Sequence, residues 1–145
     1  MSSGETQFYF KSTLFEPEPG EDRETNPLRF GKQLAEWLRD RLIENRWNVE
    51  PIIAEDWGWC LMCSRKPFAL WVGCGNVQLD PHRQAAPPVR DDIVWTCFVA
   101  AESSWLSRWR NGVSRQQTTD AVAALSAQLH RILDSDPANR WVDAP

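Results

Sequence analysis

Two cysteines spaced as C-x-x-C, Cys60 and Cys63, have the residue types and spacing of a zinc site or a thioredoxin-like redox site. Alternating polarity predicts a strand here, and strand residues three apart point to opposite faces. A redox pair also needs a following helix N-terminus to lower its thiol pKa, which residues 65–67 (Arg-Lys-Pro) do not supply. A zinc site needs a second ligand pair, but the remaining cysteines and histidines are isolated. We therefore expect inert thiols, with no metal and no cofactor; the isolated residues are Cys74, Cys97, His82 and His130.

The most distinctive local string is residues 55–59, Glu-Asp-Trp-Gly-Trp. Two carboxylates beside two indoles could bind a cation or a sugar, or form an acid–base pair. The alternative, which we favour, is structural: Asp56 caps a turn and both indoles belong to the core. If the string is functional, we expect a ligand pocket between sheet and helices. Its lining would be Glu55 or Asp56 together with Trp57, Trp59, Trp71 and Trp95.

Catalytic motifs are absent from the sequence. Asp91 and Asp92 form a second acidic pair before a predicted strand. This pair could meet Glu55 and Asp56 only if the strands that follow the two pairs are neighbours, and solvated loop charges are the simpler interpretation. Ser103 and Ser104 lack the glycines of a nucleophile elbow, and no phosphate-binding glycine motif occurs. Whether the protein is an enzyme stays open, and we lean against it.

The segment from Trp105 to Arg110 combines the residue types most enriched in protein-binding hot spots. It follows a strand and precedes a helix, where loops often carry function. The structural alternative is that the indoles cover the edge of the core under stacked arginines. Our leading hypothesis is nevertheless protein binding through Trp105, Arg108, Trp109 and Arg110.

Strand and helix signals define the elements that must position these residues. Apolar residues at helical spacing predict helices over residues 27–46, with Asn26 as N-cap and Pro27 as first residue, and from residue 118 or 119 to 133. Alternation predicts five strands, over residues 7–15, 47–53, 57–63, 68–74 and 93–101.

The resulting order, β-α-β-β-β-β-α, predicts one α+β domain with a five-stranded, largely antiparallel sheet and two helices on one face. This order resembles one repeat of the TATA-box-binding-protein-like folds, which include small ligand-binding and regulator domains. The resemblance is one of order only, so it implies no function. We expect one domain over residues 1–145, with a flexible stretch at 1–6, an acidic loop at 16–26, a proline-rich loop at 76–91 and a tail at 138–145 anchored by Trp141.

Charge and composition narrow the partners. The net charge of −4 equals that of residues 16–24, which hold five acids and one base, so we expect a solvated acidic loop on an otherwise balanced chain. No basic patch indicates nucleic-acid binding, and no apolar run is long enough to span a membrane. The N-terminus lacks the pattern of a secretory signal, so we expect a cytoplasmic protein.

Nine tryptophans in 145 residues indicate either a heavily aromatic core or a surface built for binding. The sequence therefore favours a small non-enzymatic interaction domain, an accessory, chaperone or inhibitor-like (immunity-like) protein that binds a protein partner. A small-molecule binder, or an enzyme without clear motifs, is the alternative. The partner and the oligomeric state are left open.

Overall fold

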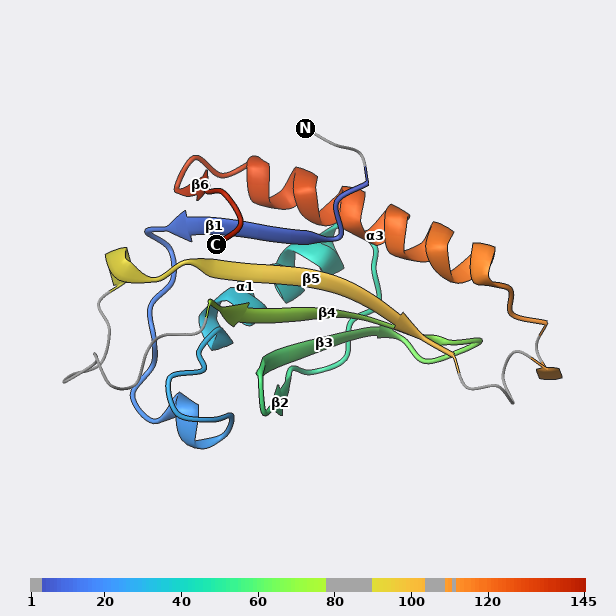
Figure 1. Cartoon of the computed structure of the whole chain (residues 1–145), viewed down its shortest axis with the longest axis horizontal. Helices are drawn as coiled ribbons and strands as arrows, with labels where there is room; N and C mark the ends of the chain where they lie inside the picture. Colours follow the sequence, from blue (N-terminus) through green and yellow to red (C-terminus); the bar gives the residue numbers. More distant parts are fainter. Residues whose placement is uncertain (1–3, 78–89, 104–108, 111) are drawn as a thin grey trace.

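The computed structural model describes residues 4–77, 90–103, 109–110 and 112–145. It shows an α+β fold in which two α-helices pack on an antiparallel sheet, as the element order predicts (Figure 1). The sheet has six strands, not five, in the order β2-β3-β4-β5-β1-β6. The sixth strand comes from the expected C-terminal tail, because residues 139–141 pair with the first strand.

The elements have the following bounds. The strands are β1 (Gln7–Ser12), β2 (Ile53–Glu55), β3 (Gly58–Ser64), β4 (Ala69–Asn76), β5 (Trp95–Glu102) and β6 (Asn139–Trp141). The α-helices are α1 (Lys32–Glu44) and α3 (Arg115–Asp134), and two short 3-10 helices are η1 (Glu21–Arg23) and η2 (Arg90–Asp92). Within the described residues, no helix combines the length and apolarity needed to cross a membrane.

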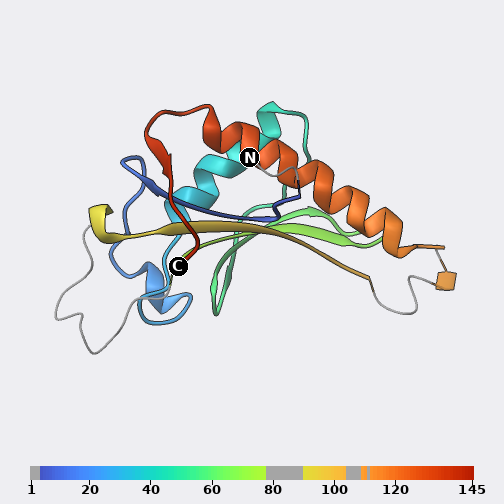
Figure 2. The ribbon, with the colours of Figure 1, turned by 45° about the horizontal axis from the view of Figure 1, so that its top comes forward.

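Both α-helices cover the same face of the sheet, as Figure 2 shows with α1 and α3 above the strands. The main core lies between them and the sheet. Alternate residues of the longer strands enter it, as Trp95, Cys97 and Val99 do in β5, and the helices contribute leucines such as Leu38 and Leu129. The intervening strand residues lie on the opposite, helix-free face.

Helix α1 begins five residues later than its apparent capping signal predicts. Leu28 has a left-handed backbone (φ 64°), so the chain cannot run helically from Pro27. The Asn26 side chain donates instead to the main-chain oxygen of Asp56. At the other end Arg46 takes the left-handed conformation (φ 69°), and Trp47 N–H donates to Leu42 O. This is a Schellman motif, in which a glycine usually occupies the left-handed position.

Helix α3 begins three or four residues earlier than predicted. Ser114 accepts a hydrogen bond from the Gln117 N–H, and the Gln117 side chain accepts one from the Ser114 N–H. This is the S-x-x-Q capping box, a signal present in the sequence and overlooked in the prediction. Strand β1 ends three residues earlier than the predicted 7–15, and the strand predicted over 47–53 is wrong except at its last residue, because β2 spans Ile53–Glu55. Ser12 Oγ accepts from Leu14 N–H and ends β1, and Pro51, which has no N–H, interrupts the segment before β2.

Candidate functional site

Three aromatic rings gather on the helix-free face of the sheet. Trp57 stacks on Trp71 with ring centroids 5.7 Å apart and an interplanar angle of 27°. Phe98 lies 5.3 Å from Trp57 and 5.5 Å from Trp71. All three side chains are half-buried, so each presents part of its ring to solvent. We call these three residues the aromatic cluster.

Glycine makes room for the aromatic cluster. A Cβ on Gly73 would lie only 2.2 Å from the Phe98 ring, so this ring sits directly on the β4 backbone. Gly73 and Phe98 are partners in the β4–β5 register, and Cys60 faces Gly73 from β3. A Cβ on Gly75 would meet the carbonyl of Trp57 at 3.3 Å. The Phe98 ring therefore rests on a glycine floor at Gly73, where an added side chain would have to displace the ring.

The tryptophans expected to share one pocket divide between the two faces. Trp59 and Trp95 are 3% and 0% exposed and belong to the core under the helices, whereas Trp57 and Trp71 lie on the opposite face. Neighbouring residues of a strand point to opposite sides, but Trp57 precedes β3 and so escapes the alternation that would place it beside Trp59. The four indoles do not line a common cavity between sheet and helices.

Glu55 and Asp56 are exposed beside the aromatic cluster, at the turn between β2 and β3. The pair does not meet Asp91 and Asp92, which are exposed on η2 before β5, because β3 and β4 separate the two strands. No contact joins the four carboxylates into one site. The bond from Asn26 to the Asp56 carbonyl does, however, join the acidic segment 16–26 to this turn.

Glu21, one of the acids expected in a solvated loop, is buried and only 2% exposed. Its Oε2 accepts hydrogen bonds from the N–H groups of Gly31 (3.2 Å) and Lys32 (3.0 Å) and from the Trp59 indole (3.0 Å). Its Oε1 accepts from the N–H of Glu18 (2.8 Å). The carboxylate thus caps α1 from outside the helix, the place where a negative charge is most stabilised.

Burial dominates the electrostatics of Glu21 and raises its pKa above the ordinary value of 4.5, although the four hydrogen bonds pull in the opposite direction. All acceptor atoms of this carboxylate are engaged by the fold, so we assign it a structural role. Sequence reasoning missed it because three of its four partners are 10 to 38 residues away.

The cysteines are buried free thiols. Cys60 lies on the helix-free face and Cys63 in the main core, so the C-x-x-C pair is divided between faces. Burial raises the pKa of Cys60 to about 11 and that of Cys63 to about 12. Cys74 and Cys97 face each other across β4 and β5 inside the core. Among the described residues, no group of three or more His, Cys, Asp or Glu side chains is placed to hold a metal ion.

The Trp/Arg segment is only partly described. Trp105 and Arg108 lie outside the described residues. Trp109 is 77% exposed, and Arg110 is exposed beside it. The visible part of the segment therefore presents an indole to solvent, and the prediction of protein binding there stays a prediction.

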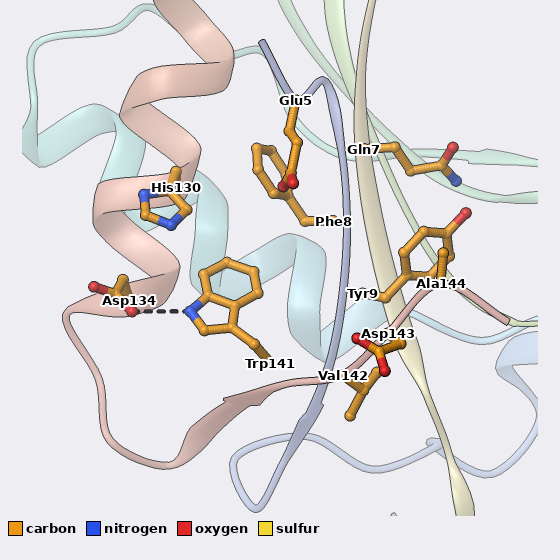
Figure 3. Close-up of a pocket in the computed structure, with 10 residues that line it drawn as sticks. All are labelled: Glu5, Gln7, Phe8, Tyr9, His130, Asp134, Trp141, Val142, Asp143 and Ala144. Carbon is orange, nitrogen blue, oxygen red and sulfur yellow. Dashed lines mark hydrogen bonds between the residues drawn. The ribbon is translucent and has the colours of Figure 1, made fainter. Parts of the chain in front are cut away.

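A cavity of about 680 Å³ lies at the edge of β1 next to β6, a place that no sequence signal indicated (Figure 3). The His130 ring of α3 lies flat against the Trp141 indole, with centroids 5.1 Å apart and an interplanar angle of 10°. Trp141 Nε1 donates to Asp134 Oδ1 at 2.8 Å. These contacts fix the Trp141 ring as one wall of the cavity.

Comparison of the chain with models of protein families, with curated proteins and with solved structures gave no match in any of the three. The functional argument rests on the geometry above.

Proposed function

We propose that this chain is a small interaction domain that binds a partner protein through the aromatic cluster on the helix-free face. The observation that carries the proposal is the mutual packing of three half-buried rings on a sheet face that neither helix covers. Partly exposed aromatic groups rimmed by charged residues are typical of protein contact surfaces.

The shape of the cluster favours a protein over a small molecule. Small-molecule sites are concave and enclose most of their ligand. Among the described residues, three cavities lie at the β1 edge, beside the first half of α3 and near the end of α1, and these three have no cluster ring in their walls. The cluster therefore offers a surface on which a partner's side chains can lie.

The charges around the cluster favour a basic partner. Glu55 and Asp56 are exposed next to Trp57, and Asn26 ties the acidic segment 16–26 to the same turn. An arginine or lysine of the partner could stack on the exposed indole surface while its charge faces these carboxylates. We place the domain in the cytoplasm, where its four buried thiols stay reduced.

The test compares wild type with one aromatic variant and one charge variant. Each is used for affinity capture from lysate, and its binding to the isolated partner is then measured. Trp57→Ala/Trp71→Ala and Glu55→Lys/Asp56→Lys should each lose the partner captured by wild type, and binding should weaken with salt. Glu36→Lys, an exposed charge change on α1, which covers the opposite face of the sheet, is the matched control and should retain the partner. Circular dichroism and urea unfolding verify that each variant is folded.

The exposed indole of Trp109 favours a second contact surface, the Trp105–Arg110 segment. Trp109→Ala should leave the captured partner in place if the aromatic cluster is the contact surface. If Trp109→Ala loses the partner while Trp57→Ala/Trp71→Ala and Glu55→Lys/Asp56→Lys retain it, the partner binds to this segment and not to the aromatic cluster.

A further inference from the structure

The edge of β1 is only partly covered. Strand β6 pairs with Phe10, Lys11 and Ser12, and beyond it Val142 N–H donates a hydrogen bond to Tyr9 O. Towards its N-terminus, β1 continues as the outer strand of the sheet. An uncovered edge of this kind is a template for a further strand.

The main chain of Gln7 points towards this open edge. The carbonyl of Thr6 accepts a hydrogen bond from Val99 N–H, so the main-chain groups of Thr6 point towards β5. Main-chain groups of successive strand residues point to alternate sides, so those of Gln7 point away from β5. Tyr9 faces the same side, as its bond to Val142 shows. The C-terminal segment, which the structure describes to its last residue, forms no hydrogen bond with the main chain of Gln7, whose N–H and C=O are oriented to pair with an added strand.

The 680 Å³ cavity follows this edge and reaches both faces of the sheet (Figure 3). The cavity is lined on the helix side by Phe8, Trp141 and His130. The centroid of the Phe8 ring lies 5.9 Å from that of Trp141 and 6.1 Å from that of His130. On the helix-free side the Gln7 amide donates to Thr96 Oγ1, and Tyr9 lies beside the C-terminal segment. An extended peptide along the edge would direct alternate side chains to these two walls.

The charges of the cavity select the side chains of that peptide. Three of its lining residues are carboxylic acids, Glu5, Asp134 and Asp143, and none is lysine or arginine. Asp134 lies on the helix side with its Oδ1 held by the Trp141 indole, and Asp143 belongs to the C-terminal segment. Aromatic rings beside carboxylates suit an ammonium or guanidinium group on an apolar stem.

We propose that an extended segment of a partner protein, carrying lysine or arginine, adds to the open edge of β1 as an additional strand. Main-chain hydrogen bonds to Gln7 supply the pairing, and the carboxylates and rings of the cavity select basic side chains. The site is distinct from the aromatic cluster, which lies over β3, β4 and β5.

The test adds a short capped peptide of alternating lysine and valine to the full chain. Binding is measured by NMR, from the amide and indole signals of the protein. We expect shifts at Gln7, Tyr9, Val142 and the Trp141 indole, and slowed hydrogen exchange at Gln7. A peptide with glutamate in place of lysine should cause none. Methylation of the central main-chain nitrogens should weaken binding about tenfold or more, because the strand hydrogen bonds are lost.

Variants separate this site from the aromatic cluster. Glu5→Gln/Asp143→Asn should weaken peptide binding without altering the fold, because neither side chain forms a hydrogen bond within the described residues. Trp57→Ala/Trp71→Ala should bind the peptide as wild type does. Absence of the NMR shifts in the wild type would overturn the proposal. Binding of the methylated peptide or of spermidine as tight as that of the unmodified peptide would also overturn it, because the cavity would then bind a cation without strand pairing.

Discussion

The indole N–H of Trp59 donates a 3.0 Å hydrogen bond to Oε2 of Glu21, which lies 38 residues earlier in the chain. The same oxygen accepts from the first N–H groups of α1. One carboxylate therefore joins the acidic segment, the first helix and β3. Lys32 adds to this junction, since its Nζ lies 5.6 Å from the centre of the Trp59 ring.

Replacing this carboxylate should destabilise the whole fold. Glu21→Gln keeps the shape of the side chain but removes an acceptor oxygen, so at least one buried donor loses its partner. We expect the free energy of unfolding to fall by roughly 1–3 kcal/mol, measured by urea denaturation. Glu24→Gln, an exposed acid of the same segment, is the control and should change stability by less than about 0.5 kcal/mol. Equal effects of the two changes would contradict the assigned role.

The raised pKa of Glu21 predicts an unusual pH dependence. Because burial raises this pKa above 4.5, the folded chain binds the proton more tightly than the unfolded chain does. The contribution of Glu21 to the free energy of unfolding should therefore grow as the pH falls from neutral through the folded-state pKa, and level off below 4.5. Carboxyl NMR titration and the difference between wild type and Glu21→Gln measure it. Titration of Glu21 at or below 4.5 would refute the prediction.

The glycine floor should be intolerant of a single methyl group. In Gly73→Ala the new Cβ would lie 2.2 Å from the Phe98 ring, so the ring must move. We expect a loss of about 1–3 kcal/mol in the free energy of unfolding. In a Phe98→Leu background, Gly73→Ala should lower the free energy of unfolding by less, because the ring that the new methyl group would meet is absent. A double-mutant cycle measures the coupling, and additive costs would show that the ring and Gly73 do not interact.

The capping box of α3 gives a prediction of local stability. Ser114→Ala removes the side-chain acceptor for Gln117 N–H and should cost about 1 kcal/mol, seen as a lower urea midpoint. Arg115→Ala, at the neighbouring exposed position, is the control. Since alanine is a good helix former, the control should keep or slightly raise stability.

Thiol reactivity should distinguish folded from unfolded chains. Burial and the raised pKa values of about 11 for Cys60 and 12 for Cys63 leave little reactive thiolate near neutral pH. We expect almost no reaction with a disulfide reagent in the native state and reaction of all four cysteines in denaturant. Rapid modification of the native protein would indicate that these strands open readily.

Local sequence signals predicted the fold better than the sites. The stripe of Leu34, Leu38 and Leu42 predicts the body of α1, and alternation in β5 predicts its two faces, because both depend on residues close in sequence. The start of α1 was wrong because Asn76, brought in from β4, binds Phe30 N–H and Leu28 O and holds the preceding chain out of the helix. No local pattern contains that information.

The candidate sites depended on which face each residue occupies. Trp57 and Trp59 look equivalent in sequence, yet the turn before β3 places them on opposite sides of the sheet. The cavity at the β1 edge needed the pairing of residues 10 and 141, which cannot be inferred from either segment alone. Tertiary pairing, more than residue type, decides which surface is available.

The position of β1 between β5 and β6 also constrains how the protein is made. Gln7 pairs with Phe98 and Phe10 pairs with Trp141, so a strand synthesised first finds its two neighbours only among later residues. On a ribosome, the β2–β3–β4 meander can assemble while the N-terminal strand still waits without a partner. We expect final closure of the sheet to be a late, slow event after synthesis, because pairing over such sequence separations is entropically costly.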